Sequence, residues 1–160
     1  MSELRTNRII PRDGLPSGSY GGIIQVKTAS AQDNTDYSDT SDTTMLTLSF
    51  TPQRADSILW IHVEYPSCRS YVSGSTRNRL NHAIKRDGTS IYTVSETPQW
   101  KGANWDSSNV EITIPVSFST FDSPNTTSAV PYTTTWASPN GQVWNTAAST
   151  RRIVIFEMAT

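Results

Sequence analysis

Apolar and polar residues alternate with a period of two in most of the regular segments of this chain. The clearest segment runs from Val110 to Phe118, where every second residue is apolar and Glu111, Thr113 and Ser117 lie between them. Successive side chains of a strand point to opposite faces, so this period is typical of a strand with one buried face. No window has the 3.6-residue period of an amphipathic helix. The sequence therefore predicts an all-β protein.

Turn signals separate eight or nine such segments at regular spacing. The expected strands are 21–27, 46–50, 58–65, 80–84, 91–94, 110–118, 132–136, 143–144 and 151–158. This arrangement, without internal repeats or intervening helices, predicts an antiparallel β-sandwich, and about eight strands of this length favour a jelly roll. A length of 160 residues fits one domain, which we place at residues 20–160.

Several local patterns make the prediction more specific. Asp87-Gly88 and Asn140-Gly141 are hairpin signals that predict positive φ at the two glycines. Trp136 and Trp144 flank the second of these turns, so they are candidates for a cross-strand pair. Pro115 cannot donate a hydrogen bond to a neighbouring strand, so its strand should lie at an edge or contain a bulge.

The segments 58–65 and 151–158 carry apolar residues on both faces. Such a strand is expected at the centre of a sheet, or at a place where its second face meets a partner. Because a chain of this size cannot cover both faces of both strands, we expect a closed ring of identical subunits, a homotrimer.

Composition and charge argue against several classes of protein, among them nucleic-acid-binding and membrane proteins. The net charge of −1 provides no basic surface for nucleic acid or an anionic membrane. No stretch is apolar enough for membrane insertion. The polar, arginine-bearing start lacks the apolar segment of a signal peptide, so synthesis in a cytoplasm without an export signal is expected. A single cysteine, Cys68, rules out an internal disulfide.

No motif of a known catalytic class is present, so we expect no enzyme activity, no cofactor and no metal. His62, His82 and Cys68 could in principle hold zinc. The favoured interpretation is one packed histidine, one exposed histidine and a lone cysteine in a loop, without metal. The polar segment 30–41 is expected to be a loop. The acidic residues between 33 and 42 lack calcium-loop spacing and favour solvated carboxylates without calcium. Four further carboxylates would suggest a glycosidase only if they converged on a cleft. They are Glu96, Asp106, Glu111 and Asp122.

The tryptophans divide into two groups. Trp60, Trp136 and Trp144 are expected in the core, whereas Trp100 and Trp105 lie in a polar loop. Burial of these two would require a neighbouring subunit or a glycan, and the subunit contact is favoured. Together with Tyr71 they are the candidate ligand or subunit contacts.

Residues 1–19 are rich in proline and glycine and cannot form a core, so they are expected to be an extended arm. The arm carries apolar anchors and arginines that can pair with carboxylates of another protein. These anchoring residues are Leu4, Arg5, Arg8, Ile9, Ile10, Arg12 and Leu15.

Several motifs occur in an order that resembles short, tail-fibre-like jelly-roll structural proteins of marine and cyanobacterial phages. They are the arm segment 4–18, Gly21-Gly22-Ile23-Ile24-Gln25-Val26, Phe50-Thr51-Pro52, Lys85-Arg86-Asp87-Gly88, Phe121-Asp122-Ser123-Pro124-Asn125-Thr126-Thr127 and Ile155-Phe156-Glu157-Met158-Ala159. The resemblance touches most of the chain. It implies a trimeric knob on a virion, held by the N-terminal arm, without a cofactor.

The expected function is that of a non-enzymatic virion structural protein, displayed on the particle surface as a tail-fibre knob or head decoration. Its expected partners are other copies of itself and capsid or tail proteins. The alternative is a carbohydrate-binding module that uses the loop tryptophans, with host-surface glycans as ligands.

Overall fold

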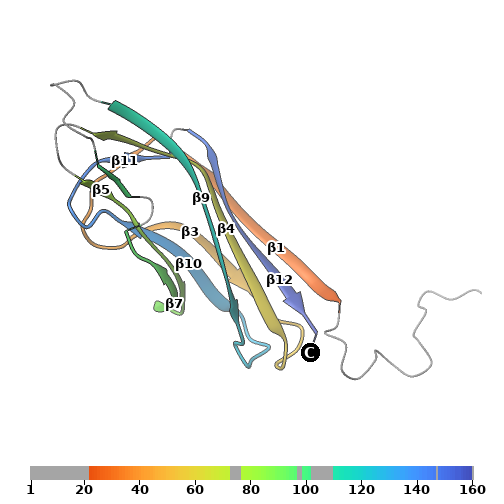
Figure 1. Ribbon diagram of the computed structural model, residues 1–160. Helices are drawn as coiled ribbons and strands as arrows, with labels where there is room; N and C mark the ends of the chain where they lie inside the picture. Colours follow the sequence, from red (N-terminus) through yellow and green to blue (C-terminus); the bar gives the residue numbers. More distant parts are fainter. Residues whose placement is uncertain (1–21, 73–76, 97–98, 102–109, 147, 160) are drawn as a thin grey trace, which may run out of the picture.

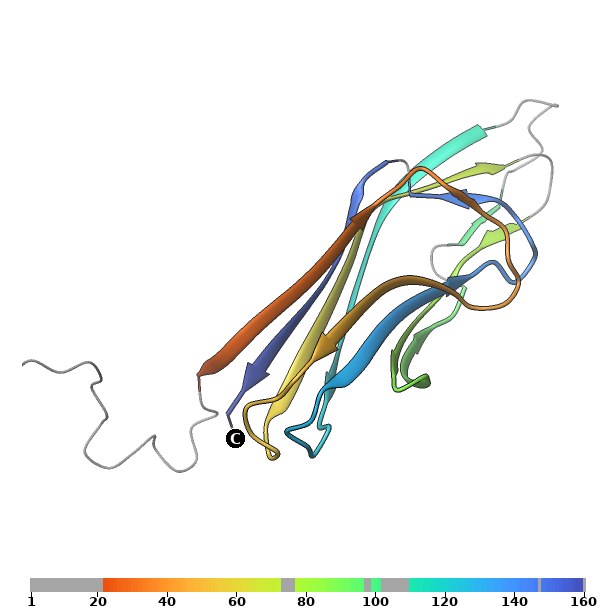
Figure 2. The same cartoon turned by 180° about the vertical axis from the view of Figure 1, so that it is seen from behind.

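The computed structural model describes residues 22–72, 77–96, 99–101, 110–146 and 148–159, and within these ranges the chain is all-β. None of the described segments is a helix that could cross a membrane. The long strands form two sheets that pack face to face along the molecule, and β5 and β8 form a separate two-stranded sheet (Figures 1 and 2). Their bounds are β1 (Ile23–Gln32), β2 (Asp36–Tyr37), β3 (Thr43–Phe50), β4 (Ile58–Val72), β5 (Arg77–Arg79), β6 (Asn81–Arg86), β7 (Thr89–Val94), β8 (Gln99–Lys101), β9 (Val110–Asp122), β10 (Val130–Ala137), β11 (Trp144–Asn145) and β12 (Thr150–Met158).

The order of the strands is that of a jelly roll. Sheet A has the order β1-β12-β4-β9 and is extended beside β4 by the short β11 and β2, whereas sheet B has the order β3-β10-β6-β7. If the eight long strands are counted along the chain, sheet A holds the first, eighth, third and sixth. Sheet B holds the second, seventh, fourth and fifth, and all neighbours are antiparallel. The predicted eight-stranded jelly-roll sandwich is therefore confirmed.

The core lies between the two sheets and follows the predicted alternation. Leu59, Ile61 and Val63 of β4 have no exposed surface, and Ile153 and Ile155 of β12 are buried beside them. Opposite them, sheet B contributes further buried apolar side chains of β3, β6 and β10, among them Leu48, Phe50, Ile84, Tyr132 and Trp136. Each fully buried aliphatic side chain contributes about 1.5–3 kcal/mol, so this layer is the main source of stability.

Pro115, which cannot donate a backbone hydrogen bond, lies on a strand at the edge of sheet A. It lies in β9, which pairs only with β4 among the described strands and is therefore an edge strand. The register between β4 and β9 also shifts between Tyr65 and Cys68, directly opposite this part of β9. The edge alternative of the prediction is confirmed, because a proline at a sheet edge removes no ladder hydrogen bond. The extra residue of the bulge lies in β4, opposite Pro115.

The two predicted hairpins have different outcomes. Asp87 and Gly88 have φ values of 48° and 79° and connect the paired strands β6 and β7, as predicted. Gly141 also has a positive φ, 65°, but the turn leads from β10 in sheet B to β11 in sheet A. Asn140-Gly141 is therefore a crossing between sheets, and the predicted cross-strand pair of Trp136 and Trp144 is wrong.

Two further sequence predictions need correction. The segment 30–41, expected to be a loop, contributes the end of β1 and all of β2, which pairs with β11. Cys68, expected in a loop, is a buried residue of β4. Both errors have the same cause. These polar segments form strands because they pair with strands that are distant in the sequence: β2 with β11, and the part of β4 around Cys68 with β9.

Arg151 connects the two sheets near the start of β12. Its guanidinium donates to the Asp33 carboxylate at 2.7 Å and to the carbonyl oxygen of Met45 in β3 at 2.9 Å. The hydrogen bond from Arg151 holds the pKa of Asp33 well below its ordinary value. Burial opposes this decrease in pKa, and hydrogen bonds from Thr146 and Tyr37 strengthen it. The Arg151 side chain is largely shielded from water, so loss of its partner costs more than breaking an exposed ion pair would.

This pair makes a prediction for acid unfolding. Because the folded-state pKa of Asp33 lies below its unfolded value of 3.8, its contribution is complete above about pH 4. The contribution is lost as the pH falls through the folded pKa. Asp33→Asn should lower the free energy of unfolding at pH 7 by about 2 kcal/mol, because the Arg151 charge is left buried without its partner. The variant should also lose part of the decrease in stability below pH 4, measured by urea denaturation.

The control is Asp56→Asn, which removes the carboxylate of an exposed pair with Arg54. Exposed pairs contribute little, so this variant should unfold at nearly the same urea concentration as the unmodified protein at pH 7. Equal stability of the Asp33 and Asp56 variants would contradict the role given to the Arg151 pair.

Candidate interaction surface

One apolar residue from each of four neighbouring strands forms a row on the outer face of sheet A. Val26 of β1 pairs with Phe156 of β12, Phe156 pairs with Trp60 of β4, and Trp60 pairs with Phe121 of β9. We call these four residues the apolar row. The rings of Trp60 and Phe156 stack with centroids 5.0 Å apart. Phe121 remains 66% exposed and Val26 52% exposed, so the row faces solvent in this chain.

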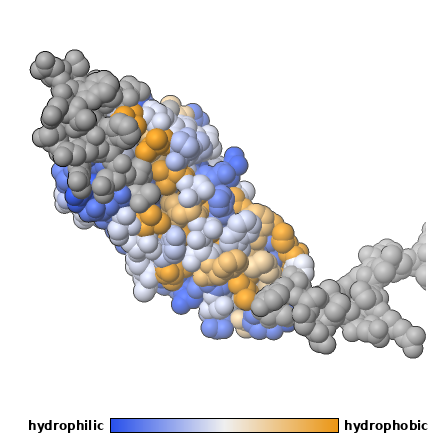
Figure 3. All heavy atoms as spheres, in the orientation of Figure 1, coloured by the Kyte–Doolittle hydropathy of each residue, from blue (hydrophilic) through white to orange (hydrophobic). Residues whose placement is uncertain are grey.

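A second, shorter row lies next to it at the end of the sandwich where β1 begins and β12 ends, which we call the basal end. Ile23 pairs with Met158, and Met158 pairs with Ile58. Together with the apolar row, these three residues make up the apolar patch. In Figure 3, orange atoms of apolar residues are visible towards the basal end of the molecule. A contiguous apolar surface on a folded domain marks an interaction site more often than a scattered residue does.

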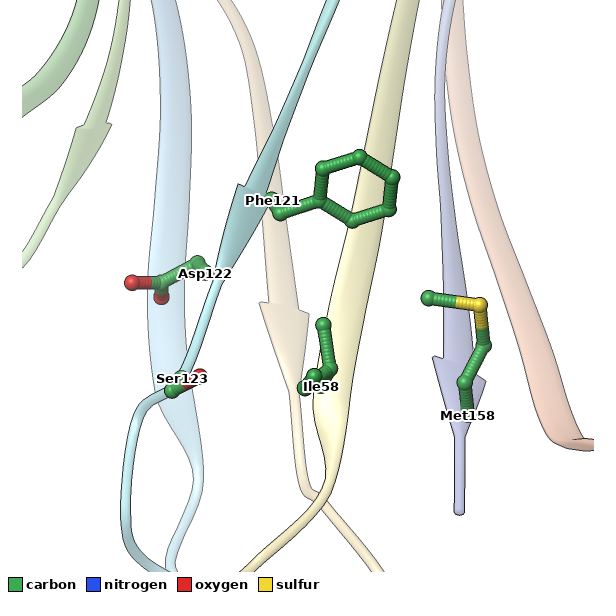
Figure 4. Close-up of a pocket in the computed structure, with 5 residues that line it drawn as sticks. All are labelled: Ile58, Phe121, Asp122, Ser123 and Met158. Atoms are coloured by element: carbon green, nitrogen blue, oxygen red, sulfur yellow. The ribbon is translucent and has the colours of Figure 1, made fainter. Parts of the chain in front are cut away.

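The patch contains a hollow between β12, β4 and β9. Its volume is about 530 Å³, and its lining consists of Ile58, Phe121, Asp122, Ser123 and Met158. Figure 4 shows the Phe121 ring reaching over β4 and the end of the Met158 side chain directed towards it. The carboxylate of Asp122 points to the other side of β9, where Tyr132 and Arg86 donate to it at 2.6 and 2.8 Å. The interior of the hollow is therefore apolar.

Away from the basal end, the outer face of sheet A becomes polar. The next row contains Val154, His62 and Ser119, and the row beyond it contains Arg152, Glu64 and Ser117. Glu64 lies 3.6 Å from the imidazole of His62 and 3.9 Å from the Arg152 guanidinium. These loose, exposed contacts contribute little to stability. They mark the boundary of the patch.

A buried carboxylate stabilises the basal end from the inside. Glu157 has no exposed surface, and its oxygens accept hydrogen bonds from the amides of Gln53 and Arg54, the hydroxyl of Ser57 and the amide group of Gln25. Burial alone would raise its pKa, but these hydrogen bonds outweigh burial and keep the pKa below the ordinary value. These hydrogen bonds fix the loop between β3 and β4 against β12. They thereby stabilise the ends of the strands that carry the patch.

The residues considered for metal binding do not meet. His82 is buried among the rings of Tyr65, Phe118 and Trp136, whereas His62 lies on the outer face of sheet A and Cys68 in the core. The acidic residues after β1 are engaged separately: Asp33 with Arg151, Asp36 with Asn145, Asp39 with Thr43 and Asp42 with Lys85. Within the described ranges, no three potential metal ligands cluster.

The carboxylates considered for glycoside chemistry do not converge either, where they are described. Glu96 pairs with Arg79, and Asp122 is bound by Arg86 and Tyr132. Asp106 lies outside the described residues. Glu111 lies in β9, but its side chain is not among those described.

The predicted contact residues have mixed outcomes. Trp136 and Trp144 are buried in the core as predicted, but Trp60 belongs to the apolar row and not to the core. Tyr71 lies near the end of β4 and Trp100 in β8, without described side chains. Trp105 lies outside the described residues, and so does the whole arm with Leu4, Arg5, Arg8, Ile9, Ile10, Arg12 and Leu15. The lectin alternative and the arm therefore stay predictions.

The sequence pattern indicates part of this surface. The two strands with apolar residues on both faces, 58–65 and 151–158, are β4 and β12, which supply the middle of the apolar row. The contributions of Val26 and Phe121 were missed. Phe121 could have been found from the alternation in β9, because the odd-numbered positions of this strand point outward and Phe121 is an apolar residue at one of them.

No protein-family model matches the sequence, and no curated protein matches it. Among solved structures, the VP2 subviral particle of infectious bursal disease virus is 17% identical over 85% of this chain and 38% of that chain, with a TM-score of 0.43. The structure of infectious bursal disease virus Gx strain is 14% identical over 97% and 44%, with a TM-score of 0.44. The insecticidal delta-endotoxin Cry8Ea1 from Bacillus thuringiensis is 12% identical over 78% and 19%, with a TM-score of 0.43.

This chain spans less than half the length of each of these proteins. At such identities and scores, the likeness carries no argument about this chain.

Proposed function

We propose that this chain is a non-enzymatic structural subunit of a virus particle, a homotrimeric jelly-roll knob on the particle surface. In this proposal the arm of residues 1–19 attaches the knob to capsid or tail proteins. The observation that carries the proposal is the apolar row, which places exposed side chains of four strands in register on one face. A surface of this kind is suited to permanent contact with another protein.

Identical subunits are the simplest partner for the apolar row. A ring of three copies buries three equivalent surfaces and leaves none exposed, whereas an open arrangement would continue to add subunits. The polar rows that follow, with Arg152 and Glu64, then lie at the rim of the contact. Interfaces commonly have this division into an apolar centre and a polar rim.

The side chains considered for catalysis also support a structural role. His82 and Cys68 are packed in the core, and Asp122 is engaged by Arg86 and Tyr132. The polar groups described here thus connect strands to one another. A stable sandwich with an apolar outer face is what a building block of a larger assembly requires.

The trimer can be tested by multi-angle light scattering at micromolar concentration. The unmodified chain should have three times the monomer mass of 17.7 kDa. Val26→Glu should produce monomers, because a charge in the apolar row loses its hydration without gaining a partner. Val143→Glu is the matched control, since Val143 is also exposed but lies outside the apolar patch, and it should leave the trimer intact. A monomeric unmodified protein would refute the trimer.

Attachment to the particle can be tested by deleting residues 2–18. The truncated knob should fold and form the same oligomer, because the core and the apolar row lie entirely within residues 22–159. It should be missing from purified particles, measured by quantitative mass spectrometry against the full-length chain. Incorporation at full occupancy would show that attachment runs through the sandwich and not through the arm.

A further inference from the structure

The hollow in the apolar patch is open to solvent, and its lining has a definite chemistry. Among the described residues that line it, Ile58, Phe121 and Met158 contribute apolar atoms, and Ser123 contributes a hydroxyl group. Asp122 is the only charged residue among the described ones that line the hollow, and its carboxylate turns away towards Arg86 (Figure 4). Such a site suits an uncharged, branched aliphatic side chain, because burying apolar surface on both partners is favourable and no polar group needs a partner.

The described part of the chain begins beside this hollow. Gly22 accepts a hydrogen bond from the amide of Ala159, and the next residue, Ile23, pairs with Met158 of the lining. Ile58 lies on the next strand, two strand spacings or roughly 10 Å from Ile23. The preceding 21 residues therefore enter the fold at the edge of an apolar site that nothing in this chain's described part covers.

We propose that Leu15 of the same chain occupies this hollow. Leu15 is the first aliphatic side chain before Ile23, eight residues away. Eight residues can span up to about 26 Å, which is more than twice the roughly 10 Å separation. A short tether gives a high effective concentration and a small closure cost, which favours Leu15 over the more distant Ile9, Ile10 and Leu4.

Pro16 strengthens this assignment. A proline restricts the residue before it to extended backbone, so Leu15 loses less conformational freedom on docking than a residue in an unrestricted segment would. Gly14 and Gly18 flank the pair and allow the chain to turn on either side of it.

The assignment refines the arm of the proposed function. Leu15 is held by the sandwich at its basal end, and the distal part with Leu4, Arg5, Arg8, Ile9, Ile10 and Arg12 remains free for the particle. The apolar row beyond the hollow keeps Val26, Trp60 and Phe156 for contact with other copies. The experiments on Leu15 use isolated protein, whereas attachment of the arm is measured on purified particles. A negative result for Leu15 would therefore not contradict the attachment of the arm to the particle.

The full-length chain can be labelled with ¹³C in the methionine methyl groups, which gives three resonances, from Met1, Met45 and Met158. Leu15→Ser should shift the Met158 resonance towards the position of a solvent-exposed methionine. The resonance of Met45 should not move, because Met45 is buried in the core. The matched control, Leu4→Ser, should move neither. A Met158 resonance that is identical in the Leu15→Ser variant and the unmodified chain would overturn the proposal.

A cross-link identifies the chain that supplies Leu15. In a Leu15→Cys, Ser123→Cys double variant, mild oxidation should produce a disulfide within one chain, seen as a faster band of monomer mass on a non-reducing denaturing gel. Cys68 is buried and does not interfere. A band of dimer mass would mean that a neighbouring copy supplies the segment and would overturn the assignment to the same chain. The Leu4→Cys, Ser123→Cys variant should give at least tenfold less cross-link, and equal cross-linking would overturn the choice of Leu15.

Discussion

The structure depends on the pairing of β4 with two long neighbours, β12 on one side and β9 on the other. This places β4 at the centre of sheet A, where Leu59, Ile61 and Val63 fill the space between the sheets. The same pairing sets Ile58 and Trp60 on the outside, in register with Met158, Phe156 and Phe121. Since side chains alternate along a strand, a register that buries one apolar set must expose the other. The core and the apolar patch are thus two consequences of one register.

Polar groups act where the apolar layer ends. Glu157 holds the β3–β4 loop at the basal end, Asp122 connects β9 to Arg86 and Tyr132 of sheet B, and Arg151 connects Asp33 to β3. Each of these carboxylates accepts hydrogen bonds from more than one donor, as a carboxylate removed from water requires. These three carboxylates therefore join strands and sheets within the molecule. The apolar patch lies outside these connections and can contact another protein.

The local part of this architecture could be predicted from the sequence. The period of two, the Asp87-Gly88 turn, the position of Pro115 and the two-faced segments 58–65 and 151–158 all depend on neighbouring residues, and the structure agrees with them. The predictions that failed depend on pairing between distant segments. Asn140-Gly141 has the backbone of a hairpin but leads into the other sheet, and β2 exists only because β11 pairs with it. Likewise, Trp60 appears as a core residue until the register with Phe156 and Phe121 places it on the outer face.

We propose that the outer face of sheet A is a buried contact surface in the assembled particle. Cryo-electron microscopy of purified particles tests it most directly, at a resolution that distinguishes the two sheets. We expect Trp60, Phe156 and Val26 to lie within contact distance of neighbouring copies around a three-fold axis. A particle in which the apolar row faces solvent, while the molecule is held through sheet B or its edges, would contradict it.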